Sequence, residues 1–225
     1  MSSYYYGGGS GFRGFIESIP PVTRNIVAIN ILLFIATLVN ENFMLVNFAM
    51  FYPASPFFKP WQIITHMFMH GGFWHIFFNM YTLLMFGIIL ERSLGSQRFL
   101  IFYFVTGLGA AALHTGVEWI QATMFLSNNA IANYHQLLMT PTLGASGAIY
   151  GVLIGYAMLY PQSRLTLLFP PITLTAKWFV IIFAVIELFT GITGFQDGIA
   201  HFAHLGGMLF GWLLIMWWRK KGRLY

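Results

Sequence analysis

Four polar residues with catalytic potential in this 225-residue chain lie in or at the start of strongly apolar segments: Ser146, His204, Asn79 and His75. Ionisable and strongly polar groups are unfavourable inside a membrane and are functional candidates there by default. A serine hydroxyl becomes a competent nucleophile when an adjacent base takes its proton, and histidine is the most common base. The combination predicts acyl-transfer chemistry, with Ser146 as nucleophile and His204 as general base.

The residues around Ser146 predict a site for the negative charge that such chemistry develops. The sequence Gly144-Ala145-Ser146-Gly147 opens an apolar run, so Ser146 is expected at a helix N-terminus. Free backbone N–H groups and the helix dipole at such an end suit an oxyanion. The fourth polar residue, His75, is four residues from Asn79 and shares a helix face with it, and the Asn79 amide is a further donor to the same charge. We expect no acidic side chain to orient His204, which predicts a Ser–His dyad rather than a triad.

The elements that must position these residues are membrane helices. Hydrophobic residues make up 58% of the chain and charged residues 8%, against roughly 25% charged in soluble domains. Stretches of about 20 apolar residues can cross a bilayer as helices. We therefore predict an all-α integral membrane protein, with one membrane domain over residues 22–218 and tails over 1–21 and 219–225. The six predicted spans are residues 25–46, 75–91, 98–117, 146–160, 175–194 and 202–218.

The distribution of basic residues predicts how these spans are oriented. Lys and Arg favour the cytoplasmic side of short loops, and ten of the eleven fall on one side of the six-span scheme, with Lys59 opposite. Both termini are therefore expected in the cytoplasm. The basic residues form no nucleic-acid-binding stripe. The ten are Arg13, Arg24, Arg92, Arg98, Arg164, Lys177, Arg219, Lys220, Lys221 and Arg223.

This orientation brings the reactive residues to one depth. Spans two, four and six all run inward from the outer face, so all four polar residues lie near the outer surface. Glycines at four-residue spacing allow close helix contact, and both span four and span six carry them. If the two stripes face each other, Ser146 and His204 come within hydrogen-bond range. The stripes are Gly147, Gly151 and Gly155 in span four, and Gly207 and Gly211 in span six.

Two long segments lie outside the predicted spans. Residues 47–74 contain prolines, glycines and many aromatics, which indicates short helices and turns in the membrane interface. Residues 118–143 are polar enough for a surface loop. The chain has no cysteine, which excludes disulfides and thiolate metal sites.

Several other polar residues have competing interpretations. His66 and His70 are four residues apart, a spacing that suits a metal, but no carboxylate or cysteine is near and structural roles are favoured. Transmembrane histidines such as His75, His114 and His204 are also conceivable haem ligands. Their predicted depths argue against a stacked pair of sites.

Glu187 and His201 lie in or beside the same helices. Glu187 falls within span five, where we interpret it as a helix-bridging hydrogen-bond partner or a protonated acid rather than a catalytic group. His201 is the rival base, although only His204 has glycines three and seven residues further on. His204 is therefore favoured.

These motifs together resemble the rhomboid intramembrane serine proteases from about Trp61 to Gly211. Trp61 to His66, followed by His70, His75 and Asn79, is similar to the family's outer loop and His-x-x-x-Asn helix. Gly144-Ala145-Ser146-Gly147 resembles the Gly-x-Ser-Gly nucleophile motif. The turn Glu91-Arg92-x-Leu-Gly-Ser96 and the final-helix motif Ala203-His204-x-x-Gly207-x-x-x-Gly211 also match.

The resemblance implies an intramembrane serine endopeptidase that needs no metal or organic cofactor. It implies that Ser146 attacks a backbone carbonyl, that His204 takes and later donates the proton, and that Tyr150 packs on the catalytic imidazole. His75, Asn79 and the Ser146 N–H would support the oxyanion.

The implied partners are membrane proteins with a transmembrane helix, cut near the outer membrane surface within a lipid bilayer, with lateral entry past span five. Because the N-terminal tail has no signal or transit peptide pattern, a bacterial cytoplasmic membrane is expected. The sequence indicates no particular oligomeric state. A transporter or channel would run polar groups through the whole membrane thickness, and a non-catalytic scaffold would tolerate Ser146→Ala. Inactive relatives lose the serine motif, which this chain keeps.

Overall fold

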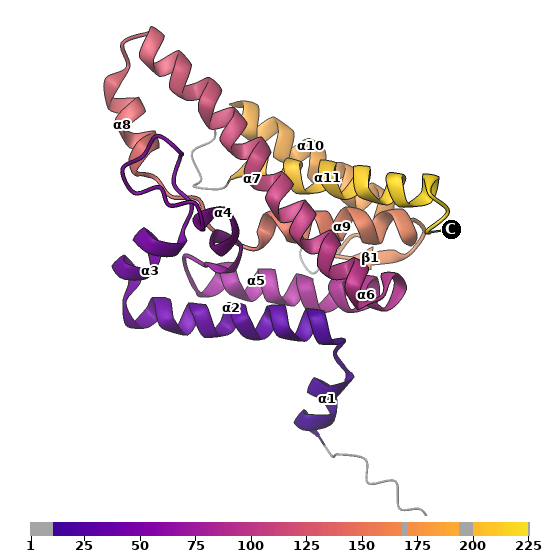
Figure 1. Ribbon diagram of the computed structural model, residues 1–225. Helices are drawn as coiled ribbons and strands as arrows, with labels where there is room; N and C mark the ends of the chain where they lie inside the picture. Colours follow the sequence, from indigo (N-terminus) through magenta and orange to yellow (C-terminus); the bar gives the residue numbers. More distant parts are fainter. Residues whose placement is uncertain (1–10, 168–170, 194–199, 225) are drawn as a thin grey trace, which may run out of the picture.

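The computed structural model describes residues 11–167, 171–193 and 200–224 (Figure 1). These residues form a helical bundle with one short hairpin, in which β1 (Arg164–Thr166) pairs antiparallel with β2 (Thr173–Thr175). The helical segments are α1 (Phe12–Ser18), α2 (Pro21–Val39), α3 (Glu41–Phe48), α4 (Gln62–Thr65), the 3-10 turn η1 (His66–Phe68), α5 (Phe73–Thr82), the π-helical turn η2 (Leu83–Gly87), α6 (Ile88–Leu94), α7 (Ser96–Ser127), α8 (Ile131–Met139), α9 (Ser146–Leu159), α10 (Ala176–Thr193) and α11 (His201–Lys220).

Several of these helices are long and apolar enough to cross a membrane. Among the described residues there are four such helices. Three are α2, α7 and α10, and the fourth is the continuous helix Phe73–Leu94, which consists of α5, η2 and α6. Helix α9 is apolar but has only 14 residues, and it lies inside the bundle, where most of its side chains are buried. The chain is thus a multi-pass, membrane-embedded helical protein.

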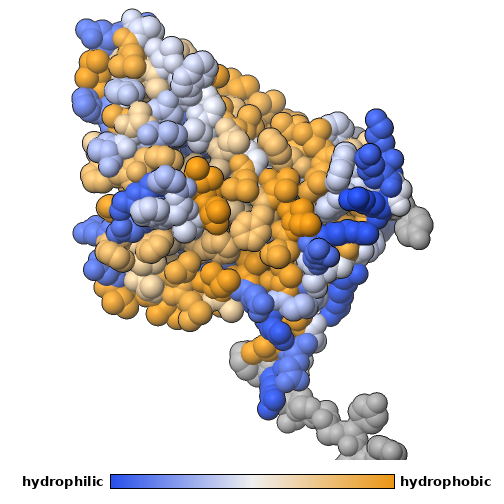
Figure 2. Space-filling view, viewed as in Figure 1, coloured by the Kyte–Doolittle hydropathy of each residue, from blue (hydrophilic) through white to orange (hydrophobic). Residues whose placement is uncertain are grey.

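The surface has the corresponding polarity. Figure 2 shows a broad hydrophobic belt across the middle of the molecule, with hydrophilic residues gathered beyond it on either side. Large apolar side chains such as Leu38, Phe189 and Ile192 are exposed within membrane-length helices. Lipid is the solvent that suits such a surface.

Close glycine contacts join α9 to α11, as the glycine spacing predicts. A methyl group at Gly207 would lie 1.8 Å from the carbonyl oxygen of Gly147, and one at Gly211 would lie 3.1 Å from that of Gly151. The prediction that these stripes face each other is confirmed for these two pairs. It is wrong for Gly155, which instead packs against Phe102 and Leu90.

Two of the predicted segment boundaries are wrong. Span one does not continue to residue 46, because Asn40 breaks the helix and its side chain accepts a hydrogen bond from the Phe43 N–H at the start of α3. The segment 118–143 is not a surface loop. Helix α7 continues to Ser127 and α8 follows, because polar residues on an exposed helix end do not interrupt the helix. The expected short helices and turns within 47–74 are confirmed by α4 and η1.

A buried carboxylate organises the end of the bundle where α9 finishes. Glu91 is 1% exposed and accepts hydrogen bonds from the Thr23 N–H (2.7 Å), the Thr23 hydroxyl (2.7 Å), the Val22 N–H (3.0 Å) and the Ser96 hydroxyl (2.7 Å). It thereby caps the N-terminus of α2, where the helix dipole favours negative charge.

Candidate active site

The nucleophile candidate Ser146 is the first residue of α9, and the preceding segment is fastened to the outer loop. Met50 and Thr142 exchange backbone hydrogen bonds of 2.9 and 2.7 Å, and the Gly144 N–H donates to the His66 carbonyl at 2.9 Å. Gly144 has a φ of +130°, which a residue with a side chain rarely adopts. The helix therefore begins at Ser146 with its N-terminus held in place.

Ser146 and His204 are brought together as predicted. The Oγ of Ser146 lies 2.9 Å from Nε2 of His204, at the point where α9 and α11 meet through Gly147 and Gly207. The ring of Tyr150, one turn along α9, stacks on the His204 ring with centroids 4.1 Å apart and an interplanar angle of 7°. The imidazole thus has the serine on one edge and an aromatic ring on one face.

The prediction that no acidic residue lies at His204 is wrong. Glu187 of α10 places Oε1 2.9 Å from Nδ1 of His204, on the ring edge opposite the serine. The contact has ion-pair distance, although its angle departs from that of a hydrogen bond. Glu187 also bridges helices, in agreement with the hydrogen-bonding role expected for it, since it accepts from the Tyr150 hydroxyl.

The rival base His201 lies on the other side of the same carboxylate. Its Nδ1 is 2.7 Å from Oε2 of Glu187 and 3.1 Å from the Thr190 hydroxyl. The imidazole that contacts Ser146 Oγ is that of His204, through Nε2. The geometry favours His204 as the partner of the serine.

His75 and Asn79 lie on α5, across from the start of α9. A methyl group at Gly144 would lie 2.8 Å from Nε2 of His75, so this ring faces the backbone just before the serine. Asn79 donates one amide N–H to the His75 carbonyl at 2.8 Å. Its amide has a second N–H for another acceptor.

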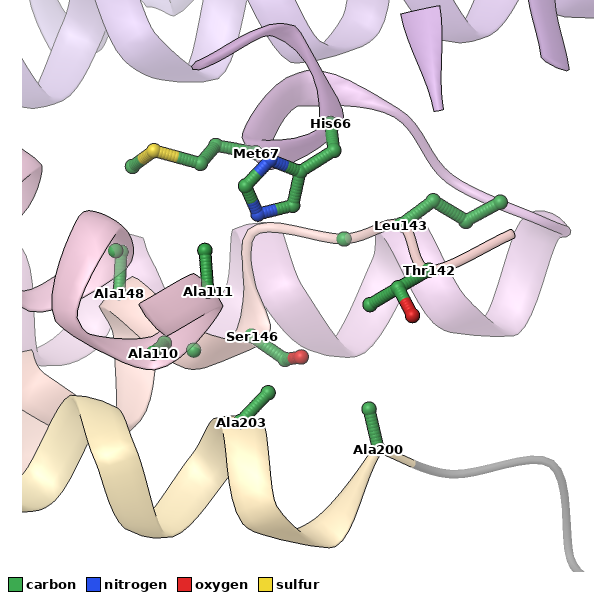
Figure 3. Close-up of a pocket in the computed structure, with 13 residues that line it drawn as sticks. His66, Met67, Ala110, Ala111, Thr142, Leu143, Ser146, Ala148, Ala200 and Ala203 are labelled. Atoms are coloured by element: carbon green, nitrogen blue, oxygen red, sulfur yellow. The ribbon is translucent and has the colours of Figure 1, made fainter. Parts of the chain in front are cut away.

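A small cavity adjoins the serine. Its volume is about 20 Å³, enough for one water molecule. Figure 3 shows Ser146 between Ala203 of α11 and the turn η1, which begins at His66, with Thr142 alongside. The lining is mostly alanine and glycine, so the space beside the serine is narrow.

Three further histidines, His66, His70 and His114, have structural surroundings. Nδ1 of His66 lies 2.8 Å from the Gln62 carbonyl, and burial lowers the pKa of His66. His70 packs its ring against that of His75, with centroids 4.9 Å apart. Burial is the main cause, and the nearby His75 the second, of a His70 pKa lowered to about 3. His114 faces the Thr142 hydroxyl at 2.8 Å. Within the part of the chain that the structure describes, no three His, Cys, Asp or Glu side chains gather as a metal site would require.

Comparison with known proteins identifies the family of this chain. A family model described as the rhomboid domain matches residues 57–221, well over half of the chain. The chain belongs to the rhomboid family. The matched range contains Ser146, His204, His75, Asn79 and Glu187.

Curated relatives of this rhomboid chain come from plants, bacteria and fungi. It is 32% identical to RHOMBOID-like protein 4 of Arabidopsis thaliana over 154 residues, covering 68% of this chain and 33% of that protein. It is 28% identical to Rhomboid protease AarA of Providencia stuartii over 161 residues (68% and 54%). It is also 28% identical to Rhomboid protein 1, mitochondrial, of Saccharomyces cerevisiae over 160 residues (71% and 42%). The chain spans between a third and about half the length of these relatives.

Proposed function

We propose that this rhomboid protein is an intramembrane serine endopeptidase. The observation that carries the proposal is the 2.9 Å contact between Ser146 Oγ and His204 Nε2 at a helix N-terminus inside an apolar bundle. Two relatives are named as proteases, Rhomboid protease AarA and Rhomboid-like protease 3 of Toxoplasma gondii. Membership of the family supports a membrane-protein substrate within a lipid bilayer.

The reaction follows from the positions of the two side chains. Nε2 of His204 takes the Ser146 proton as Oγ attacks the scissile carbonyl carbon, giving a tetrahedral oxyanion. The Ser146 N–H, His75 and the free N–H of Asn79 are the proposed donors to that oxygen. His204 then protonates the leaving amine as the C–N bond breaks. Water hydrolyses the acyl-enzyme with His204 again acting as base, which restores the serine hydroxyl.

The proposed topology has six spans with both termini in the cytoplasm, a membrane domain over residues 22–218 and tails over 1–21 and 219–225. Hydrogen bonds from arginine side chains to backbone carbonyls support this orientation. Arg92 donates to the Ser18 carbonyl at 2.9 Å, Arg98 to that of Arg223 at 3.0 Å and Arg219 to that of Met158 at 2.8 Å. These contacts join the ends of α1, α6, α7, α9 and α11 on one side. Residues 1–10 and 225 lie outside the described part of the chain.

We further propose that the substrates are transmembrane helices of other proteins, cut near the outer surface of a bacterial cytoplasmic membrane. A helix hides its peptide bonds in its own hydrogen-bond ladder, so the cleaved segment must unwind first. The narrow space beside Ser146 favours small residues at the cleavage site.

The test is cleavage of a model transmembrane substrate by the protein reconstituted in liposomes. Wild type should release fragments cut within or next to the substrate helix, and Ser146→Ala and His204→Ala should release none while remaining folded. Cleavage retained in either variant would contradict the proposal.

A further inference from the structure

Glu187 joins three helices at the catalytic end of the bundle. It lies on α10, and its carboxylate contacts Tyr150 of α9 and both His201 and His204 of α11. Its side chain is buried, with 6% of the residue exposed, although most of α10 faces outward. A carboxylate at this depth is unfavourable unless it is paired, so its partners indicate what it does.

The two oxygens of Glu187 have separate partners. Oε1 accepts from the Tyr150 hydroxyl and lies 2.9 Å from Nδ1 of His204. Oε2 lies 2.7 Å from Nδ1 of His201, whose ring is thereby held beside the Thr190 hydroxyl. Three groups that can donate a proton surround one acceptor, which favours the ionised carboxylate.

The position of Oε1 relative to Ser146 has a mechanistic consequence. The two ring nitrogens of His204 face different partners, Nδ1 facing Glu187 and Nε2 facing Ser146. A carboxylate at Nδ1 favours the tautomer with its proton on that nitrogen and leaves Nε2 as the acceptor. Nε2 is the atom that must take the serine proton.

We propose that Glu187 is a positioning residue that completes a Ser146–His204–Glu187 triad. The carboxylate keeps the Nδ1 proton of His204 in place, stabilises the imidazolium formed when Nε2 takes the serine proton, and does not itself become protonated. Tyr150 fixes the site twice, by stacking on the His204 ring and by donating to the same Oε1. This inference rests on the proposed function, because it assigns a role within that reaction.

A purely structural bridge between α9, α10 and α11 is the rival explanation. It would lower stability when lost and would leave the chemistry of each folded molecule unchanged. Glu91 offers a matched control, since it is a buried glutamate that also bridges helices but contacts only backbone N–H groups and hydroxyls.

The experiment compares wild type, Glu187→Gln, Glu187→Asp and Glu91→Gln in detergent. It measures the rate constant for fluorophosphonate labelling per folded molecule, and kcat and KM for a transmembrane substrate. Glutamine keeps the shape and removes the charge, so we expect Glu187→Gln to slow labelling by about 10-fold or more, towards the roughly 10⁴-fold loss known for triad carboxylates. The loss should appear in kcat rather than KM.

Glu187→Asp keeps the charge and should label faster than Glu187→Gln, whereas Glu91→Gln should label at the wild-type rate. Wild-type labelling of Glu187→Gln, or equal losses in the Gln and Asp variants, would overturn the proposal while leaving the Ser–His pair intact. Failure of the wild type itself to label would overturn the proposed function and the triad together.

Discussion

Two buried glutamates, Glu91 and Glu187, lie near opposite ends of the helix α9 and have different kinds of partner. Glu91 lies near the end of α9, where the Ser93 hydroxyl meets that of Tyr160 at 2.7 Å, and its partners are backbone N–H groups and hydroxyls. Glu187 is close to the start of α9, and its partners are two imidazoles and a phenol. In the proposed mechanism the partners of Glu91 keep their protonation state during turnover, whereas His204 changes its own.

The role of a buried charge depends on what its partners do. Both carboxylates are satisfied by hydrogen bonds or ion pairs, so burial alone does not separate them. What distinguishes the two carboxylates is the group that each of their partners contacts or belongs to. Glu91 holds backbone N–H groups of α2 and two hydroxyls. His204, the partner of Glu187, contacts the Ser146 hydroxyl through Nε2 at 2.9 Å. We therefore expect loss of Glu91 to affect folding and loss of Glu187 to affect reaction rate.

The largest effect should come from disturbing the contact that holds the catalytic end together. In Gly207→Ala the new methyl would meet the Gly147 carbonyl oxygen at 1.8 Å, so α9 and α11 must separate. Overpacking of this kind costs about 1–3 kcal/mol or more, and it also separates His204 from Ser146. We expect labelling and cleavage to be nearly lost.

The matched control is Gly116→Ala in α7, where a methyl group meets no atom within 4 Å. That variant should be as active as wild type and slightly more stable, because alanine is a better helix former than glycine. Wild-type activity of Gly207→Ala, measured beside it, would show that the glycine contact does not set the site geometry.

Glu91→Gln should have the next largest effect, on stability. Its hydrogen bonds are to a charged acceptor, and each such bond contributes about 1.5–3 kcal/mol. We expect the melting temperature in detergent to fall by several degrees with the labelling rate of the folded protein unchanged. A slowed rate without destabilisation would reverse the roles assigned to the two glutamates.

His201→Ala should reduce activity by less than Glu187→Gln does. It removes the partner of Oε2 and leaves the Oε1 contact with His204 in place. Steady-state cleavage by this variant, beside His204→Ala, measures how much of the carboxylate's orientation depends on His201. Complete loss of cleavage would instead make His201 a candidate base.

The smallest expected effect concerns pH and the outer loop. His70 is buried with a pKa lowered to about 3, whereas the unfolded chain binds this proton near pH 6.5. The unfolded state therefore holds more protons between these values, and stability is lost as pH falls below about 6.5. Between pH 6.5 and pH 5 the loss from this group is about 2 kcal/mol.

Replacing the titrating ring tests this expectation. His70→Phe should show a smaller drop in melting temperature from pH 7 to pH 5 than wild type shows. Part of the drop should remain, because burial also lowers the pKa of His66. An unchanged pH dependence would show that His70 is not a source of the acid sensitivity.

Much of the site was predictable because its residues carry local signals. Ser146 follows a helix-starting glycine motif, and His204 is followed by glycines at the spacing that lets α11 approach α9. Those two patterns specify which faces meet, and the contacts of Gly207 with Gly147 and of Gly211 with Gly151 confirm them. The approximate positions of the membrane helices followed from hydropathy.

The position of Glu187 was not predictable for a physical reason. Helix α10 is apolar on most of its faces and mainly exposed, so hydropathy does not indicate which face turns toward the bundle. Without that rotation, Glu187 is a buried acid with unknown partners. The break at Asn40 and the extension of α7 to Ser127 were missed because apolarity and helicity do not end at the same residues.

The most direct measurement is fluorophosphonate labelling of the purified protein, with the modified residue located by mass spectrometry. The wild type should carry one adduct on Ser146, Ser146→Ala should carry none, and His204→Ala should label at least about 10³-fold more slowly. Absence of an adduct on folded wild-type protein that also leaves a transmembrane substrate uncut would contradict the assignment of an activated serine.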